Sequence, residues 1–182
     1  MFSYGVERAL NVALDAHAGQ FRKGSDAPYA VHPLHVAVLL ARLNADDEVI
    51  QAGLLHDIVE DCEDWTLERL SADFGARVAG IVAEVTEDKT RSWIERKEHA
   101  IAHVSELSED ALLVKACDKL HNLESLARAL ADADSQADVW QRFTGGRERT
   151  IDTSTRLVDE LEPRVDAKLG RMLRSALGAL AS

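Results

Sequence analysis

The sequence LLHDIVED, residues 54–61, places a His-Asp pair and a Glu-Asp pair directly behind apolar residues. On a helix, residues three and four apart share a face, so His56 would lie with Glu60, and Asp57 with both Glu60 and Asp61. Burying such polar groups without partners costs several kcal/mol. The four side chains therefore need a metal ion, a cation or one another, and we expect the fold to be organised around them.

Imidazole and carboxylate groups are ligands of borderline divalent metals such as manganese, iron, cobalt or zinc. The chain has only two cysteines, so a structural zinc site with four cysteine ligands is disfavoured. A His-Asp pair supplies two ligands, and the others must come from elsewhere. Two residues are candidates because they interrupt apolar patterns: His32, at the start of a helix, and Asp118, inside an inward-facing segment. Taken alone, such residues are more often packed, exposed or paired with a base than bound to a metal.

Apolar residues recur at helical spacing through almost the whole chain. The spacing predicts that one helix starts with Pro33 as its first residue and that the next carries the motif at its C-terminal end. No segment shows sustained alternation with a period of two, which would indicate a strand. Helices are expected over residues 6–18, 66–73, 76–85 and 93–105, over a long segment from 109, and over the segments after the Gly145-Gly146 pair. The sequence therefore predicts an all-α fold, with residues 1–182 forming one domain of about eight to ten helices.

The composition restricts the partners and the compartment. Asp and Glu number 32 against 21 Lys and Arg, which gives a formal net charge of −11. A field of that sign repels nucleic acid and anionic membranes, so neither is expected as a partner. The N-terminus lacks the basic and then apolar run of a signal peptide, and no uncharged stretch approaches the ~20 residues of a membrane span. We expect a cytoplasmic protein with Cys62 and Cys117 reduced.

A His, a His-Asp pair and an Asp in this order resemble the HD-type metal-dependent phosphohydrolases, an all-helical superfamily. Further blocks extend the resemblance to the hydrolase domain of the RelA/SpoT alarmone enzymes, and most closely to the stand-alone small alarmone hydrolases. These blocks are FRK at 21–23, PY at 28–29, HP at 32–33, FG at 74–75, VTEDKT at 85–90 and KACDKLHNL at 115–123. The resemblance covers residues 5–130 and is weaker over 131–182.

The resemblance implies roles for individual residues and a divalent metal, usually manganese. A divalent ion lowers the pKa of bound water, and a neighbouring carboxylate can accept the proton. The matching metal ligands are His32, His56, Asp57 and Asp118; the water-activating pair is Glu60 and Asp61; the residues that meet the nucleotide are Arg22, Lys23 and Asn122. A basic pair in so acidic a chain is also what a polyanionic substrate would require.

The C-terminal third departs from the resemblance. In the similar hydrolases an arginine and, one turn later, a tyrosine approach the substrate, whereas here Arg147 is followed one turn later by Ile151. The Gly-Gly pair before Arg147 suggests a differently shaped lid. The apolar stripe of the last helix, with Leu169 and Leu173, is more typical of a core than of a dimer face, and both a monomer and a homodimer stay open.

Several functions therefore remain open at this point. The leading one is a manganese-dependent hydrolase that removes the 3′-pyrophosphate of guanosine tetraphosphate or pentaphosphate and leaves GDP or GTP. A second keeps the fold and metal but takes an adenosine alarmone, a reduced dinucleotide phosphate or another phosphate ester. The third is a sensor that binds an alarmone without cleaving it, and Glu60 and Asp61 argue against it because a binder needs no water-activating pair.

Overall fold

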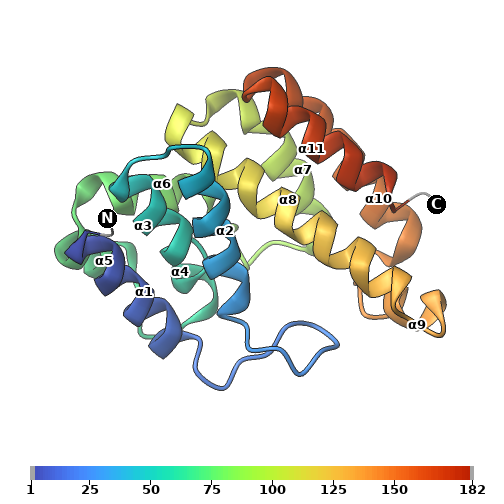
Figure 1. Ribbon diagram of the computed structural model, residues 1–182, viewed down its shortest axis with the longest axis horizontal. Helices are drawn as coiled ribbons and strands as arrows, with labels where there is room; N and C mark the ends of the chain where they lie inside the picture. Colours follow the sequence, from blue (N-terminus) through green and yellow to red (C-terminus); the bar gives the residue numbers. More distant parts are fainter. Residues whose placement is uncertain (1–2, 181–182) are drawn as a thin grey trace. The chain divides into compact units, whose positions relative to one another are not determined.

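The computed structural model describes residues 3–180, which form eleven α-helical segments and two 3₁₀ turns (Figure 1). Over these residues the one β-type pairing is an isolated bridge between Phe21 and Pro28. The all-α prediction is confirmed. The α-helices are α1 (Tyr4–Ala16), α2 (Val31–Arg42), α3 (Asp47–Leu55), α4 (Ile58–Asp61), α5 (Leu67–Phe74), α6 (Ala76–Val85), α7 (Trp93–Ala102), α8 (Glu109–Ala131), α9 (Gln136–Trp140), α10 (Gly146–Leu161) and α11 (Ala167–Gly178). The 3₁₀ turns are η1 (Val104–Glu106) and η2 (Glu162–Arg164).

The chain divides into two compact units. The first comprises the residues up to Glu87 together with Ser108–Asp118, and the second comprises Asp88–Leu107 and the chain from Lys119 onward. Helix α8 contributes its first part to one unit and the remainder to the other. The prediction of one domain over residues 1–182 stays a prediction.

Helix α3 is the centre of the first unit, where it packs against α1, α2 and α6 (Figure 1). All its residues from Val49 to Leu55 are buried, and all of them except Gln51 are apolar or glycine, as expected of a helix in a core. The N-cap of the helix is Asp46, whose side-chain carboxylate accepts hydrogen bonds from the N–H groups of Glu48 and Val49 at 3.1 Å. This cap fixes where the helix starts, and thereby where its last residues meet the core.

Arg77 joins three helices of the first unit. Its guanidinium lies 2.8 Å from the carboxylates of Asp46 and Glu48 at the start of α3, and 2.9 Å from that of Asp110 at the start of α8. Because these carboxylates stand at helix N-termini, they also interact favourably with the helix dipoles. The ion pairs anchor the beginning of the helix that carries Asp118.

In the second unit, α10 packs against α7 and α11. The apolar stripe of α11 is buried: Leu169 and Leu173 are 1% and 0% exposed. The expectation that this stripe belongs to a core is thereby confirmed. None of the helices between residues 3 and 180 is both long and apolar enough to span a membrane.

The Gly145-Gly146 pair forms the start of α10 in the second unit. Gly146 has a φ of +62°, a left-handed conformation that L residues rarely adopt. Gly145 has an ordinary right-handed backbone, but a Cβ atom on it would lie 2.5 Å from Cη2 of Trp93. Gly146 is therefore required for its backbone conformation, whereas Gly145 is required because the Trp93 indole packs against its backbone and leaves no room for a side chain.

Candidate metal centre

The His-Asp pair lies at a break between two helices. Helix α3 ends at Leu55 and α4 begins at Ile58, so the expectation that one helix carries the whole motif is wrong. Successive residues on an uninterrupted helix point about 100° apart. At the break, the neighbouring side chains approach each other instead, and Nε2 of His56 lies 3.2 Å from Oδ2 of Asp57.

Side chains from three separate segments of the first unit meet at this break. Nε2 of His32, on α2, lies 3.2 Å from Nε2 of His56 and 3.4 Å from Oδ2 of Asp57. Oδ1 of Asp118, on α8, lies 3.2 Å from Nε2 of His32 and 3.8 Å from Nε2 of His56. The structure thus brings together all four residues that the sequence suggested as metal ligands.

The two imidazoles are buried and oriented. His32 and His56 are 2% and 5% exposed. The carbonyl oxygen of Gly53 can only accept a hydrogen bond, so Nδ1–H of His56, 2.9 Å away, donates to it. The neutral ring then carries its lone pair on Nε2, which faces the cluster. A fixed outer partner of this kind is usual for metal-bound histidines.

The charges of the cluster reinforce one another. Burial alone would lower the pKa of His56, but the charges of Asp57 and Asp118 outweigh it and raise that pKa above its ordinary value. Burial alone would raise the pKa of Asp118, whereas its contact with His32 and the charge of His56 hold the pKa below its ordinary value. The site therefore favours ionised carboxylates, as a cation site requires.

The donor set fits a divalent ion. One ligand atom each from His32, His56 and Asp118 lie within 4.8 Å of one another, and Asp57 Oδ2 is close to both imidazoles. Two imidazole nitrogens with two carboxylate oxygens form the mixed set that borderline divalent metals prefer. His32, His56 and Asp118 could hold such an ion, with Oδ2 of Asp57 beside both imidazoles as a fourth ligand atom.

Glu60 and Asp61 lie on α4, next to the cluster in sequence, and both are half-buried. Oε2 of Glu60 accepts a hydrogen bond from the N–H of Glu87 at 3.1 Å. Burial raises the pKa of Glu60, and the charges of Asp57 and Asp61 add to the increase although the Glu87 hydrogen bond opposes it. A carboxylate with a raised pKa is a better proton acceptor than an exposed one, which suits a general base.

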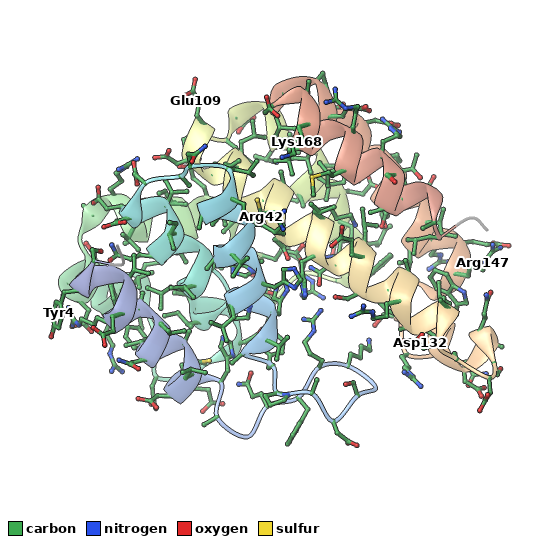
Figure 2. All side chains as sticks on the ribbon, in the orientation of Figure 1. Tyr4, Arg42, Glu109, Asp132, Arg147 and Lys168 are labelled. Atoms are coloured by element: carbon green, nitrogen blue, oxygen red, sulfur yellow. The ribbon has the colours of Figure 1, made fainter. Side chains whose placement is uncertain are left out.

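The four residues expected to meet the nucleotide fall into both units. Arg22 and Lys23 lie in the loop between α1 and α2, which the Phe21–Pro28 bridge closes. Asn122 lies on α8 and is half-buried. Arg147 lies in the first turn of α10, where its side chain is exposed and extends outward (Figure 2).

The sequence did not assign roles to three groups that contact the site residues. The hydroxyl of Tyr29 lies 2.7 Å from Oδ2 of Asp57, and burial, with the charge of Asp57, raises the pKa of Tyr29. The hydroxyl therefore donates to the carboxylate. The other two groups, the Gly53 carbonyl and the Glu87 amide, belong to the backbone, where side-chain identity gives no signal. For Tyr29 the available signal was its position three residues before His32.

Comparison with known proteins identifies the family. The family model of the HD domain matches residues 9–149. The chain is 41% identical over 141 residues to guanosine-3′,5′-bis(diphosphate) 3′-pyrophosphohydrolase MESH1 of Xenopus tropicalis, covering 76% of this chain and 78% of that protein. It is 36% identical over 127 residues to the guanosine-3′,5′-bis(diphosphate) 3′-pyrophosphohydrolase of Haemophilus influenzae, covering 66% of this chain and 18% of that protein.

A solved structure agrees with these sequence matches. It is that of a metazoan ortholog of SpoT, described as hydrolysing ppGpp, and it superimposes with a TM-score of 0.82 at 32% sequence identity. The superposition covers 96% of this chain and 94% of the other. The resemblance seen in the motifs is confirmed, and the chain belongs to the HD domain family.

Proposed function

We propose that the protein is a metal-dependent hydrolase that removes the 3′-pyrophosphate of guanosine tetraphosphate or pentaphosphate, giving GDP or GTP and pyrophosphate. One observation carries the proposal: two imidazole nitrogens and two carboxylates, from His32, His56, Asp57 and Asp118, converge, and the half-buried carboxylate of Glu60 follows on the adjacent helix. The names and descriptions of the similar proteins support the choice of substrate.

The proposed cofactor is Mn2+, held by His32, His56, Asp57 and Asp118. When bound, a divalent ion supplies a Lewis acid beside the phosphate and makes coordinated water more acidic. Glu60 is proposed to accept the proton of the attacking water, because its raised pKa suits a base and its Oε2 is oriented by the Glu87 amide. Asp61 is proposed to support it by adding negative charge.

The remaining assignments concern the substrate and the surroundings. Arg22 and Lys23 are proposed to bind phosphate groups, Asn122 to face the nucleoside, and Arg147 to supply a further cation. The net charge of −11 supports a small-molecule nucleotide rather than a nucleic acid as the partner. We propose a cytoplasmic location and either a monomer or a homodimer.

A second substrate class stays open because of one residue. Ile151 lies one turn beyond Arg147 on α10. The family resemblance implies a tyrosine at this position. Without that ring the nucleoside side of the site has one aromatic contact fewer. An adenosine alarmone or a reduced dinucleotide phosphate is therefore the second candidate substrate.

The test is a substrate panel with purified protein. Guanosine alarmones, adenosine alarmones, a reduced dinucleotide phosphate and simple nucleotides are incubated with manganese or with a chelator, and pyrophosphate and inorganic phosphate are measured separately. We expect pyrophosphate from the guanosine alarmones with manganese and none with the chelator. Inorganic phosphate from another nucleotide, without pyrophosphate from the guanosine alarmones, would show that the proposed substrate is wrong.

A matched pair of variants links the activity to the cluster. Asp57→Ala should abolish pyrophosphate release because it removes a carboxylate next to both imidazoles. Asp64→Ala changes an exposed aspartate a few residues away and should leave the rate within about twofold of wild type, since exposed substitutions away from special features have small effects. Equal losses in both variants would mean that the cluster is not the catalytic centre.

A further inference from the structure

Tyr29 contacts the candidate metal centre from outside. Its hydroxyl lies 2.7 Å from Oδ2 of Asp57, and this oxygen is also the one that lies 3.2 Å from His56 and 3.4 Å from His32. An ionised carboxylate only accepts hydrogen bonds, so the tyrosine hydroxyl is the donor. The hydrogen bond therefore fixes the position of the oxygen that faces both imidazoles, rather than that of a remote atom of Asp57.

The Tyr29 ring is itself held in place by its neighbours. Its centroid lies 4.6 Å from that of the buried His17 ring and 6.0 Å, edge to face, from that of His32. The backbone is fixed as well: the N–H of Tyr29 donates to the carbonyl of Gln20 at 2.8 Å. The phenol thus cannot swing away from Asp57 without disturbing packing on its other sides.

The Tyr29 ring also contacts Arg22, a cationic residue of the loop between α1 and α2. The guanidinium carbon of Arg22 lies 5.5 Å from the centroid of the Tyr29 ring, within the range of a cation–π interaction. The Arg22 backbone N–H donates to the carbonyl of Ala27 at 2.8 Å, so the loop that presents Arg22 folds back next to Tyr29. One side chain therefore contacts both a metal-ligand carboxylate and a residue proposed to bind phosphate.

We infer that Tyr29 is a positioning residue with two separable actions: its hydroxyl orients Asp57 for the divalent ion, and its ring orients Arg22 toward the substrate phosphate. The inference rests on the proposed function for the metal and for the anionic substrate. Outer partners of metal ligands typically contribute about 10- to 100-fold to metal affinity. The two actions predict different effects for variants that remove the hydroxyl alone or the whole ring.

The first measurement is manganese affinity, obtained by calorimetric titration of metal-free protein without substrate. Tyr29→Phe keeps the ring and removes the hydroxyl, and it should weaken Mn2+ binding about 10- to 100-fold. The matched control is Tyr4→Phe, the same change at the only other tyrosine of the chain, which is 80% exposed on α1 (Figure 2). Wild-type affinity in Tyr29→Phe, or an equal loss in Tyr4→Phe, would overturn the inference.

The second measurement separates the ring from the hydroxyl. At saturating manganese, Tyr29→Phe should keep the substrate KM within about twofold of wild type, because the ring stays. Tyr29→Leu should raise KM beyond that, but by less than Arg22→Gln does, because it loses only the cation–π interaction that orients Arg22, whereas Arg22→Gln also loses the charge that binds phosphate. Arg22→Gln should retain wild-type manganese affinity. A KM for Tyr29→Leu equal to that of Tyr29→Phe would refute the role of the ring.

Loss of folding and failure of the proposed function can both be distinguished from these outcomes. Metal-free Tyr29→Phe should unfold within a few degrees of metal-free wild type, since a single hydrogen bond is removed and the shape is kept. The manganese titration contains no nucleotide, so it stands if guanosine alarmones prove not to be the substrate. If the wild type bound no manganese, the metal assignment and this inference would fall together.

Discussion

Gly145 should resist substitution for reasons of space alone. Its φ of −78° and ψ of −11° are open to any residue, so replacing it with alanine introduces no backbone strain. The new Cβ would, however, lie 2.5 Å from Cη2, 2.9 Å from Cζ2 and 3.0 Å from Cζ3 of Trp93. Since real Cβ contacts are longer, either the indole or the start of α10 must move.

The expected loss follows from two opposing contributions. Forcing an extra methyl group into a packed site costs about 1–3 kcal/mol. Replacing glycine by alanine lowers the entropy of the unfolded chain and returns about 0.4–1 kcal/mol. We therefore expect Gly145→Ala to lower the free energy of unfolding by about 1–2 kcal/mol, which for a chain of this size lowers Tm by about 2–8 °C.

The assay is differential scanning calorimetry of metal-free protein, with Gly80→Ala as the matched control. Gly80 is an exposed residue inside α6, where an added Cβ would meet nothing within 4 Å. Alanine there should raise stability by about 0.5–1 kcal/mol because glycine is costly in a helix interior. If Gly145→Ala melts at or above the wild-type Tm, the packing argument for the Trp93 contact is wrong.

Further results are expected for the metal, for Glu60 and for Arg77. Loading with manganese at about 100 times its Kd should stabilise the protein by about 2.7 kcal/mol, so a chelator should lower Tm by about 5–11 °C in a melting assay. Glu60→Gln should reduce turnover about 10²- to 10⁴-fold. Burial raises the pKa of Glu60, and the base must be deprotonated to act. As the pH is lowered, wild-type activity should therefore begin to fall at a higher pH than it would with an exposed glutamate as the base. For the same reason the ionised Glu60 carboxylate destabilises the folded state above that pKa. Metal-free Glu60→Gln should therefore have a Tm at pH 7 no lower than that of metal-free wild type, and a lower Tm would contradict the burial of this carboxylate. Arg77→Gln breaks contacts with Asp46, Glu48 and Asp110 and should lower Tm at low salt, with a smaller difference at high salt; a salt-independent loss would mean that packing dominates.

Helix positions that depend on local residues were predicted well from the sequence. Residues 76–85 were predicted to be helical and form α6 with the same bounds, and Thr66 caps α5 with its side-chain oxygen 3.2 Å from the N–H of Arg69. Pro33 was expected as the first helical residue, but α2 begins at Val31. Proline is tolerated throughout the first turn, where N–H groups have no helical partner, so its presence does not specify which position it occupies.

The break at the His-Asp pair could not be predicted in the same way. The local sequence around His56 suits a continuous helix. In the structure, however, the helix is interrupted at His56 and Asp57, whose side chains both face His32. Convergence of residues from α2, α8 and the break depends on tertiary packing, which spacing along the chain does not encode. The family resemblance suggested that these residues act together, while the outer partners of His56 and Asp57 are seen only in the structure.

Asp57 and His56 differ in whether mutagenesis can remove the group that holds each of them in place. Asp57 is held by a tyrosine side chain, which a codon change can remove. His56 is held by the carbonyl of Gly53, which every amino acid possesses, so alanine scanning would never expose that contact. A backbone ester formed by placing the hydroxy-acid analogue of leucine at position 54 would weaken the carbonyl as an acceptor. Chemical protein synthesis, rather than mutagenesis, is thus the way to measure what that carbonyl contributes to the histidine.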